Sequence, residues 1–533
     1  MATTVAENTV AVTERQWSAR VSGAMLARLA ARAAVAAPAD VIPIEAPFTS
    51  ETLGQVPAGT PADVAAAVAA ARAAQRDWAA LPLDERAAVL LRFHDLFIAR
   101  AGEILDIIQL ETGKSRHHAF EEVEHIAIQA RYYAHSAAAH LRPRRRQGAL
   151  PLLTRTIEHR RPRGVIAIIG PWNYPLSLSI GDAIPALVAG NAVVLKPDAQ
   201  TPYSALWAAA LLAEAGLPAA LLQIVTGRGT VLGTPLIDAA DYLMFTGSTA
   251  TGKVVAAACA AQLKGCSMEL GGKNPLLVLP DARLGAAVRG AVRGICANTG
   301  QLCVGIERVY VHEAVYDSFA PRLAEALRRV SLGATLDFSV DMGSLVSADQ
   351  LAKVSAHVDD AVGKGAEVLA GGRARPDVGP YFYEPTLLAG VTEDMVLCRE
   401  ETFGPVAAVC RCDSVDEMVE RANDTTYGLN ASVWTSNARS GRQVAARLQA
   451  GTVNVNEAYA ATFGSAGAPM GGFKESGLGR RHGAQGIVKY TEPQTVAEER
   501  VIALDTPPLV SHERYAAFMT LALRVLRRTP GID

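Results

Sequence analysis

The sequence predicts an α/β protein built from doubly wound parallel sheets in more than one domain. Short apolar runs lie at 165–169, 192–195, 221–225 and 242–245, and segments with helical spacing lie at about 175–189, 203–215 and 250–262. Strands that are apolar throughout and alternate with helices are typical of a parallel sheet covered on both faces. Strands near 276–279 and 307–312 begin a second such alternation, which continues to about residue 456. A chain of 533 residues is too long for one core, so we expect two or three domains.

Composition and charge exclude several classes of protein. The net charge of −2 at pH 7 gives no general reason to expect nucleic acid or acidic membranes as partners. The seven cysteines include no CxxC pair, which argues against a disulfide framework or zinc site and favours a reducing compartment. No apolar run approaches the roughly 20 residues of a membrane span, and we find no signal-peptide pattern. We therefore expect a cytoplasmic protein without stable membrane insertion.

The first 140 residues predict a tail followed by helices. Residues 1–40 are rich in alanine and arginine, which is typical of a poorly ordered tail leading into one surface helix. Apolar residues at three- and four-residue spacing predict helices from Pro61 to Arg100, and Glu111–Lys114 interrupts the helical region.

A group of histidines and glutamates follows this interruption. His118, Glu122 and His125 share one helical face by spacing, so a metal site is one interpretation. No partner motif elsewhere completes a ligand set, and charged helical faces usually meet solvent. We therefore predict no metal.

Residues 142–163 form a basic segment. A nucleic-acid patch is one interpretation, but the segment lacks interleaved aromatic residues. Thr154–His159 alternates like an exposed strand, which favours a structural role.

The carboxyl ends of the parallel strands carry the informative residues, and ligands bind beyond such ends. These segments are 170–174, 196–199 and 246–252. The usual GxGxxG fingerprint is absent. Instead Phe245–Thr249 follows a strand and opens a helix, so its backbone amides and the Ser248 hydroxyl could receive a pyrophosphate. An ordinary glycine-containing helix start is the alternative.

Cys303 lies in the turn-forming stretch Ala297–Val304, behind a glycine and two amide side chains. Cysteine is readily made a nucleophile near neutral pH, and amides are the donors that a developing oxyanion needs. Glu269 lies 34 residues earlier, before two glycines, and could act as a general base. The alternatives are a buried, inert cysteine and a carboxylate paired with Lys273. Cys259 and Cys296 are expected in the core.

Three separated motifs occur in an order that resembles the NAD(P)-dependent aldehyde dehydrogenase family. They are Gly170–Pro175, Met268–Pro275 and Ala297–Val304, and the resemblance extends through Glu401–Pro405, Gly451–Asn456 and Gly471–Gly477 over roughly residues 40–500. It implies two doubly wound α/β domains, one for the cofactor and one for catalysis, and a small β oligomerisation element.

The resemblance also implies domain limits and assembly. The expected parts are an N-terminal tail and helix at 1–40, a cofactor domain at 41–140 and 162–271 with 460–484 returning to it, a catalytic domain at 272–459, oligomerisation strands at 141–161 and 485–503, and an amphipathic tail at 504–533. A homodimer or homotetramer is expected. The helix expected at Tyr515–Arg528 fits a neighbouring subunit better than a membrane surface.

Catalytic roles follow from the resemblance. Cys303 would attack the aldehyde, the Asn173 amide and the Cys303 backbone N–H would stabilise the oxyanion, and Glu269 would activate water to release a free acid. The residues expected at the cofactor are Pro171, Trp172, Asn173, Lys196, Pro197, Asp198, Ala199, Gly247, Ser248, Leu270, Glu401 and Phe403.

The residue at 199 bears on cofactor choice. NAD-preferring members commonly carry a glutamate there, whereas this chain has Ala199. Its absence removes repulsion toward a 2′-phosphate, and Lys196 could help to neutralise one. NADP is therefore expected, with NAD possible because Asp198 could partly replace the missing carboxylate.

Substrate choice is less strongly indicated. Stretches such as Asp341–Leu345 and Arg480–Gly483 resemble actinobacterial succinate-semialdehyde dehydrogenases. Other enzymes of that type grip the substrate carboxylate with two arginines, where this chain has Gly181 and Ala297. Small residues predict a wider, less polar mouth, although Arg293 could serve. The expected substrate pocket comprises Tyr174, Gly181, Ala297, Leu302 and Val304.

Three functions therefore remain open. The first is oxidation of succinate semialdehyde to succinate with NADP. The second is a broad-specificity aromatic or long-chain aldehyde dehydrogenase. The third, of another class, is a catalytically silent structural or nucleic-acid-binding relative that uses the basic segment.

Overall fold

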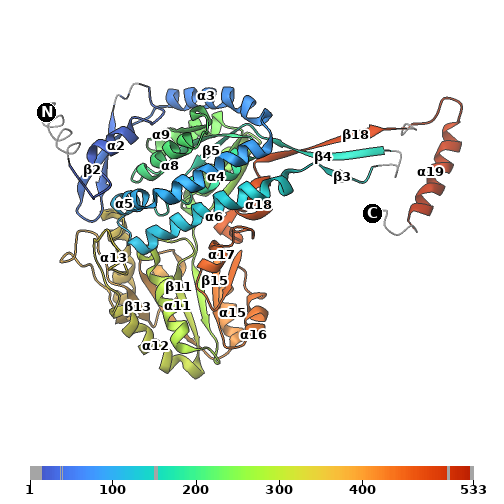
Figure 1. Ribbon diagram of the computed structural model, residues 1–533. Coiled ribbons are helices and arrows are strands. Elements are labelled where there is room, and N and C mark those ends of the chain that lie inside the picture. The colour runs from blue at the N-terminus through green and yellow to red at the C-terminus, as the bar shows by residue number, and fades with distance from the viewer. Residues whose placement is uncertain (1–14, 37, 39, 149–153, 501–504, 528–533) are drawn as a thin grey trace.

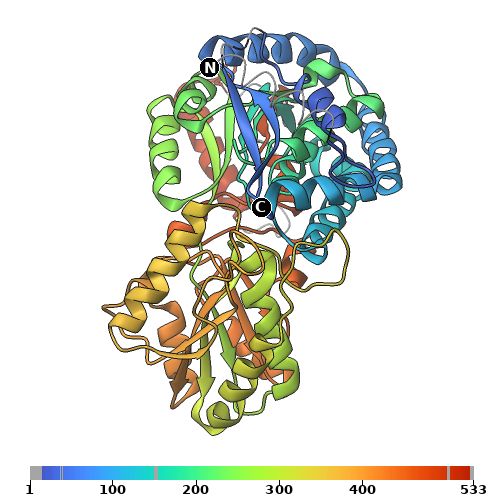
Figure 2. The ribbon, with the colours of Figure 1, turned by 90° about the vertical axis from the view of Figure 1, so that its left-hand side faces the viewer.

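The computed structural model describes residues 15–36, 38, 40–148, 154–500 and 505–527. Two lobes, each centred on one sheet, lie one above the other, and a narrow arm projects from the upper lobe (Figures 1 and 2). No helix in these described ranges is long and apolar enough to cross a membrane. The α/β fold class predicted from the sequence is confirmed.

The upper lobe contains a six-stranded sheet in the order β17-β9-β8-β5-β6-β7. Its strands are β5 Val165–Ile169, β6 Ala192–Lys196, β7 Leu222–Ile224, β8 Tyr242–Thr246, β9 Gly265–Glu269 and β17 Gly477–Leu478. All neighbours are parallel except β17, which returns late in the chain and pairs antiparallel with β9. Every residue of β5 and β6 is buried, as expected for strands covered on both faces.

Helices cover this sheet and extend the lobe (Figure 1). They are α2 Gly23–Ala30, α3 Pro61–Ala80, α4 Leu83–Ala99, α5 Ala101–Thr112, α6 Arg116–Leu141, α7 Ile180–Val188, α8 Tyr203–Glu214, α9 Gly229–Ala239, α10 Thr249–Ala261 and α18 Gly483–Val488. A hairpin of β1 Val41–Ala46 and β2 Glu51–Pro57 lies beside them. The predicted interruption at Glu111–Lys114 is confirmed, because α5 ends at Thr112 and Gly113 adopts a left-handed conformation.

One helix is shorter than expected. Helical spacing predicted a helix over 175–189, but α7 begins only at Ile180. The backbone N–H groups of Leu176 and Ser177 instead donate to the Glu122 carboxylate, each at 2.9 Å. A tertiary contact therefore holds this segment as a turn.

The lower lobe contains a seven-stranded sheet in the order β12-β13-β14-β11-β10-β15-β16. Its strands are β10 Asn274–Val278, β11 Ile306–His312, β12 Glu367–Ala370, β13 Thr386–Ala389, β14 Val406–Cys412, β15 Asn430–Trp434 and β16 Thr452–Val455. The pairing is parallel except between β12 and β13. The accompanying helices are α11 Leu284–Cys296, α12 Glu313–Arg328, α13 Ala348–Gly363, α14 Val396–Arg399, α15 Val415–Asn423, α16 Ala438–Ala445 and α17 Ala460–Phe463.

The arm is a three-stranded antiparallel sheet of β3 Arg144–Arg146, β4 Thr154–Pro162 and β18 Thr491–Glu499 (Figure 1). Every residue of β18 after Thr491 is exposed. The predicted strand at 154–159 is confirmed, and part of the basic segment is neutralised inside the arm, where Glu158 pairs with Arg146 and Arg160. Helix α19, His512–Leu526, lies at the end of the arm and contains no buried residue.

Helix α11 carries the chain to the cysteine turn and packs closely on the sheet. A Cβ atom at Gly290 would lie 2.0 Å from Cζ2 of Trp434 in β15. A larger residue there would have to displace a buried aromatic ring, and overpacking of this kind typically costs about 1–3 kcal/mol.

We expect Gly290→Ala to lower the midpoint of thermal or urea unfolding for this reason. Gly233→Ala is the matched control, because Gly233 also lies inside a helix but a Cβ atom added there would have no neighbour within 4 Å. Alanine at 233 is expected to gain about 0.5–1 kcal/mol of stability, through helix propensity alone. Equal shifts in both variants would contradict the packing argument.

Candidate active site

The cysteine turn is built from three consecutive residues with left-handed backbone conformations. The φ values are 49° at Asn298, 57° at Thr299 and 70° at Gly300. Non-glycine residues in this region cost on the order of 1–3 kcal/mol and persist only where surrounding contacts hold them. A Cβ atom at Gly300 would lie 1.9 Å from the Gly404 carbonyl oxygen, so only glycine lets the turn meet the 401–405 segment.

Amide side chains hold this turn against the loop after β5. Asn298 Nδ2 donates to the carbonyl oxygens of Asn173 and Gln301, both at 2.9 Å. Asn173 Nδ2 donates to the same Gln301 oxygen at 3.0 Å, and Gln301 Oε1 accepts the Val346 N–H at 2.9 Å. The Asn173 amide thus contacts the chain two residues before Cys303.

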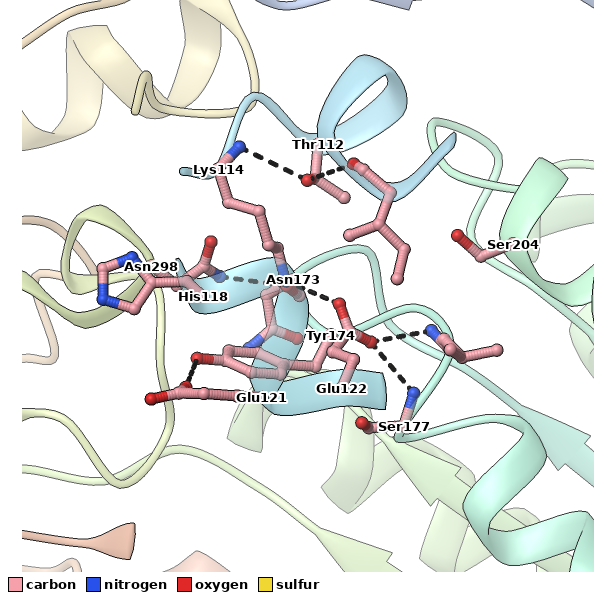
Figure 3. A network of polar contacts seen from close by, with 12 residues as sticks. Thr112, Lys114, His118, Glu121, Glu122, Asn173, Tyr174, Ser177, Ser204 and Asn298 are labelled. Atoms are coloured by element: carbon pink, nitrogen blue, oxygen red, sulfur yellow. Dashed lines mark hydrogen bonds and ion pairs between the residues drawn. The ribbon is translucent and has the colours of Figure 1, made fainter. Parts of the chain in front are cut away.

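The buried ion pair of Lys114 and Glu122 supports the loop that carries Asn173 (Figure 3). Lys114 Nζ donates to Glu122 Oε1 at 2.7 Å and to the Asn173 carbonyl oxygen at 2.6 Å. Both charged side chains are fully buried. The other oxygen of Glu122 accepts the two N–H groups of the turn before α7. This carboxylate therefore holds that turn directly and holds Asn173 through Lys114.

Glu269 is the last residue of β9 and is 5 % exposed. Burial raises the pKa of Glu269 to about 7, while nearby Arg481 and Lys489 oppose the rise. The alternative pairing with Lys273 is wrong, because the Lys273 ammonium pairs with Glu307. A carboxyl group that titrates near neutrality suits general-base chemistry.

Cys303 lies within electrostatic reach of Glu269. Burial raises the pKa of the Cys303 thiol to about 12, the charges of Glu269 and Glu401 raise it further, and Arg481 lowers it. The Cys303 carbonyl oxygen accepts a hydrogen bond from Asn274 Nδ2 at 2.7 Å, which fixes the chain beside β10. The thiol is therefore neutral at rest. Cys259 and Cys296 are buried, as expected.

Several of the expected cofactor residues meet around Gly271 and Gly272. Glu401 Oε1 accepts the Gly272 N–H at 2.8 Å, and a Cβ atom at Gly271 would lie 2.6 Å from Glu401 Oε2. The rings of Trp172 and Phe403 meet edge to face, with centroids 5.4 Å apart. Pro171 and Leu270 are buried beside these segments.

The remaining expected cofactor residues lie at the ends of β6 and β8. Lys196 is buried, and its Nζ donates to the carbonyl oxygen of Pro197 at 2.9 Å. Asp198 accepts the Gln200 N–H at 2.9 Å, and Ala199 is half-buried beside it. The Gly247 N–H donates to the Glu269 carbonyl oxygen, which joins this edge to the candidate base.

Ser248 is the N-cap of α10. Its hydroxyl accepts the Thr251 N–H at 3.3 Å and donates to Thr251 Oγ1 at 3.0 Å. The hydroxyl proton is thus used within the helix, which leaves the first-turn amides as the groups suited to a pyrophosphate.

The other side of the Asn173 loop is lined by aromatic and charged residues. Glu121 accepts hydrogen bonds from the hydroxyls of Tyr174 at 2.9 Å and Tyr459 at 2.6 Å. Arg293, in the last turn of α11, is half-exposed and contacts Glu121 and Glu457 at 3.4 Å. Ala297, Leu302 and Val304 are buried close by in the same core cluster as Tyr174.

The space beside Gly181 is occupied. A Cβ atom at Gly181 would lie 3.0 Å from Cε1 of His125, whose ring stacks on Phe463 with centroids 4.6 Å apart. A small residue here therefore makes room for a histidine from α6 and does not widen the mouth at this point.

The histidine and glutamate group on α6 has other partners. His118 contacts the Ser115 hydroxyl, Glu122 pairs with Lys114, and His125 Nε2 lies 3.0 Å from His482 Nε2. Throughout the ranges that the structure describes, no three His, Cys, Asp or Glu side chains form a group that could hold a metal ion.

Known proteins resemble this chain in both sequence and fold. The profile of the aldehyde dehydrogenase family matches residues 35–496, which is most of the chain. The chain belongs to the aldehyde dehydrogenase family. A Mycolicibacterium smegmatis relative is 54 % identical over 489 residues, covering 92 % of this chain and 95 % of the relative; its provisional name is succinate-semialdehyde dehydrogenase, NADP(+).

Two further aldehyde dehydrogenases differ in the substrate that they are named for. The phenylacetaldehyde dehydrogenase of Pseudomonas fluorescens is 38 % identical, covering 84 % of this chain and 91 % of that one. The crystal structure of succinate-semialdehyde dehydrogenase from Burkholderia pseudomallei has a TM-score of 0.83 at 36 % identity, covering 86 % of this chain and 95 % of that one.

Some residues around this aldehyde dehydrogenase site could not be identified from the sequence. Lys114, Asn298 and Arg481 lie in segments that the sequence singled out, but no local pattern reveals their buried partners. Glu121 and Tyr459 lie 338 positions apart and meet only in the folded chain. The one local signal for Lys114 is its position in the segment that interrupts two helices, and its burial is known only from the structure.

We expect Lys114→Met to destabilise the protein by about 3–5 kcal/mol, because it leaves the Glu122 carboxylate buried without its partner. The double variant Lys114→Met with Glu122→Gln should recover part of this loss. Lys253→Met is the control, because Lys253 and Glu475 form a surface pair worth about 1 kcal/mol or less. Urea unfolding midpoints of the four proteins measure the difference, and a double variant no more stable than Lys114→Met would count against the ion pair.

Proposed function

We propose that this enzyme oxidises an aldehyde to a free acid through a covalent intermediate on Cys303. The observation that carries the proposal is the meeting of Cys303, Asn173 and Glu269 around one turn, although they lie on separate segments. A silent structural or nucleic-acid-binding relative would have no need for a buried carboxyl group with a pKa of about 7 beside a cysteine.

In the first half-reaction the Cys303 sulfur bonds to the aldehyde carbon to form a thiohemiacetal. The Asn173 Nδ2 and the Cys303 N–H would donate to the oxygen as it gains charge, and one such donor is typically worth about 3 kcal/mol. Because the thiol is neutral at rest, its proton must leave before or during attack. Glu269 is the carboxyl group that acts most strongly on the thiol, and its pKa of about 7 suits it to accept this proton.

In the second half-reaction Glu269, after releasing the thiol proton to solvent, would take a proton from water, whose oxygen attacks the resulting thioester carbonyl. The carbon–sulfur bond breaks, the acid leaves and Cys303 is restored. A general base of this kind typically contributes about 10² to 10⁴ in rate. Lys273 pairs with Glu307 and not with Glu269, so this lysine leaves the Glu269 carboxylate available.

NADP is the proposed cofactor, with NAD possible; when bound, it accepts the hydride of the thiohemiacetal. The cradle fits such a group: Gly271 and Gly272 allow close backbone approach, the Trp172 and Phe403 rings border it, and Glu401 lies at its edge. Lys196 and Ala199 would face a 2′-phosphate. Because residue 199 is an alanine, it carries no acidic group that would repel this phosphate. The provisional NADP(+) name of the mycobacterial relative supports this choice.

Succinate semialdehyde is the proposed substrate, on the basis of the 54 % identical relative. Its carboxylate would need a cation, and Arg293 is a half-exposed guanidinium next to Tyr459, with contacts no shorter than 3.4 Å. The aromatic surroundings of Tyr174, Tyr459 and Phe463 favour the second candidate, an aromatic or long-chain aldehyde, as does the phenylacetaldehyde relative.

The parts of the fold receive proposed roles as well. The lobe with the six-stranded sheet would bind the cofactor, and the seven-stranded lobe would carry the nucleophile. The exposed arm of β3, β4 and β18 would join copies into a homodimer or homotetramer, because an open sheet edge favours pairing with another chain. A cytoplasmic location is inferred from the seven free cysteines.

We expect Cys303→Ala to abolish cofactor-dependent aldehyde oxidation. We expect Glu269→Gln to lower turnover about 10²- to 10⁴-fold and to accumulate an acylated protein, visible as added mass on the peptide of Cys303. The base works only when deprotonated, so wild-type turnover should rise with pH through about 7, and this limb should be lost in Glu269→Gln. Unchanged oxidation by Cys303→Ala would rule out the mechanism.

The substrate and cofactor are tested by kcat/KM for succinic semialdehyde, benzaldehyde and octanal, each with NADP and NAD. We expect succinic semialdehyde with NADP to rank first. Arg293→Gln should raise KM for succinic semialdehyde about tenfold, because it removes one charged hydrogen bond to the substrate carboxylate. KM for octanal, which has no carboxylate, should not change. If succinic semialdehyde ranked last in the wild type, the substrate proposal would be wrong while the mechanism could stand.

A further inference from the structure

A buried arginine lies beside the active site and has no role in the mechanism above. Arg481 is 5 % exposed. Its Nη2 donates to Asp182 Oδ2 at 2.8 Å and to Thr246 Oγ1 at 2.9 Å. Its Nε is buried and has no hydrogen-bond partner among the described residues. A guanidinium is always charged, so this is a permanent positive charge in the protein interior.

Strand pairing places this charge next to Glu269. Thr246, which accepts from Arg481, is the last residue of β8 and the register partner of Glu269 in β9. Neighbouring strands lie about 4.8 Å apart. On the other side β17 pairs Gly477 with Glu269, which brings the 471–483 segment against the same strand end. A Cβ atom at Gly471 would lie 3.0 Å from Glu269 Oε1.

Asp182 anchors the arginine. It lies in α7 and accepts from Arg481, from Lys489 at 3.4 Å and from the Tyr490 hydroxyl at 3.3 Å. Two positive groups and one carboxylate thus leave an excess of positive charge in this pocket of the interior. Cys303 and Glu269, the two proposed reacting groups, must each become anionic during the reaction.

We propose that Arg481 is a positioning residue whose buried charge, held by Asp182, favours the anionic forms of Cys303 and Glu269. The inference rests on the proposed roles of those two residues. It explains how a thiol enclosed with two carboxyl groups, Glu269 and Glu401, can ionise at all. Opposite charge within about 4–6 Å typically shifts a pKa by 1–3 units.

The electrostatic surroundings agree with this placement. Burial raises the pKa of Glu269, and Arg481 is the leading charge that lowers it, whereas Asp182 raises it. Burial raises the pKa of Cys303, and Arg481 again lowers it. The charged or titratable groups that face Glu269, Cys303 and Arg481 are Asp182, Arg480, Lys489, Tyr490, Glu401, Tyr133, His125 and His482.

The test uses the full-length protein with three substitutions. Arg481→Gln removes the charge, Arg481→Lys keeps it, and Asp182→Asn removes the opposing negative charge. One measurement is the rate of Cys303 alkylation by iodoacetamide at about pH 8, followed by peptide mass, which needs neither substrate nor cofactor. The other is the midpoint of the acid limb of kcat for aldehyde oxidation. Thermal unfolding checks that each variant is folded.

In Arg481→Gln we expect alkylation to slow about tenfold and the acid-limb midpoint to rise by about one pH unit. Arg481→Lys should stay close to the wild-type values of both. In Asp182→Asn the acid-limb midpoint should fall, the direction opposite to Arg481→Gln. A purely structural role would impair both variants without moving the midpoints in opposite directions.

The proposal is overturned if folded Arg481→Gln keeps both wild-type values, or if Arg481→Lys is impaired as much as Arg481→Gln. If Arg481→Gln does not fold, Asp182→Asn decides: a midpoint that does not fall overturns the proposal. Failure of the proposed function is distinguishable, since it would appear as aldehyde oxidation by Cys303→Ala whatever the state of residue 481.

Discussion

The site depends on hydrogen bonds that Lys114, Glu122 and Asn298 make with two segments of the chain. One segment is the loop that carries Asn173, and the other is the turn that carries Cys303. Asn173 follows β5 in one lobe, and Cys303 follows α11 in the other. The Asn298 amide donates to the carbonyl oxygens of Asn173 and Gln301, and the Lys114 ammonium donates to the same Asn173 oxygen. All of these groups are buried, where each donor and acceptor must find a partner or cost about 1–3 kcal/mol. The network therefore fixes the relative position of the proposed nucleophile and the proposed oxyanion donor.

The same constraint explains the strained backbone. Asn298 and Thr299 adopt left-handed conformations that side chains rarely take, and Gly300 meets Gly404 with no room for a Cβ atom. The 401–405 segment also carries Glu401 and Phe403, which border the proposed cofactor cradle. One tight turn thus links the proposed nucleophile, the proposed amide donor and the segment that borders the proposed cofactor site. The strained backbone of this turn persists because neighbouring segments hold it in place.

Charge is distributed in layers around the reacting atoms. Lys114 with Glu122 and Lys273 with Glu307 form closed pairs, so they contribute little net field. Arg481, Lys489 and Asp182 leave an excess positive charge near Glu269 and Cys303, and the Glu401 carboxyl group opposes ionisation of the thiol. The two ion pairs position the chain, whereas the excess positive charge around Arg481 lowers the pKa values of Glu269 and Cys303. This division explains why a thiol that is neutral at rest can lie beside a carboxyl group with a pKa of about 7.

The sequence alone determined the fold class and the family and supplied the candidate catalytic residues, because apolar strand periodicity and short motifs are local properties of the chain. Strands β5, β6 and β8, and the turn around Cys303, could be placed within a residue or two. Only the tertiary structure decided that residues 175–179 form a turn, that Lys273 pairs with Glu307, and that His125 fills the space beside Gly181. It also decided the surroundings of Arg481. Each of these depends on partners tens to hundreds of residues apart, and no local pattern encodes which buried charge will meet which.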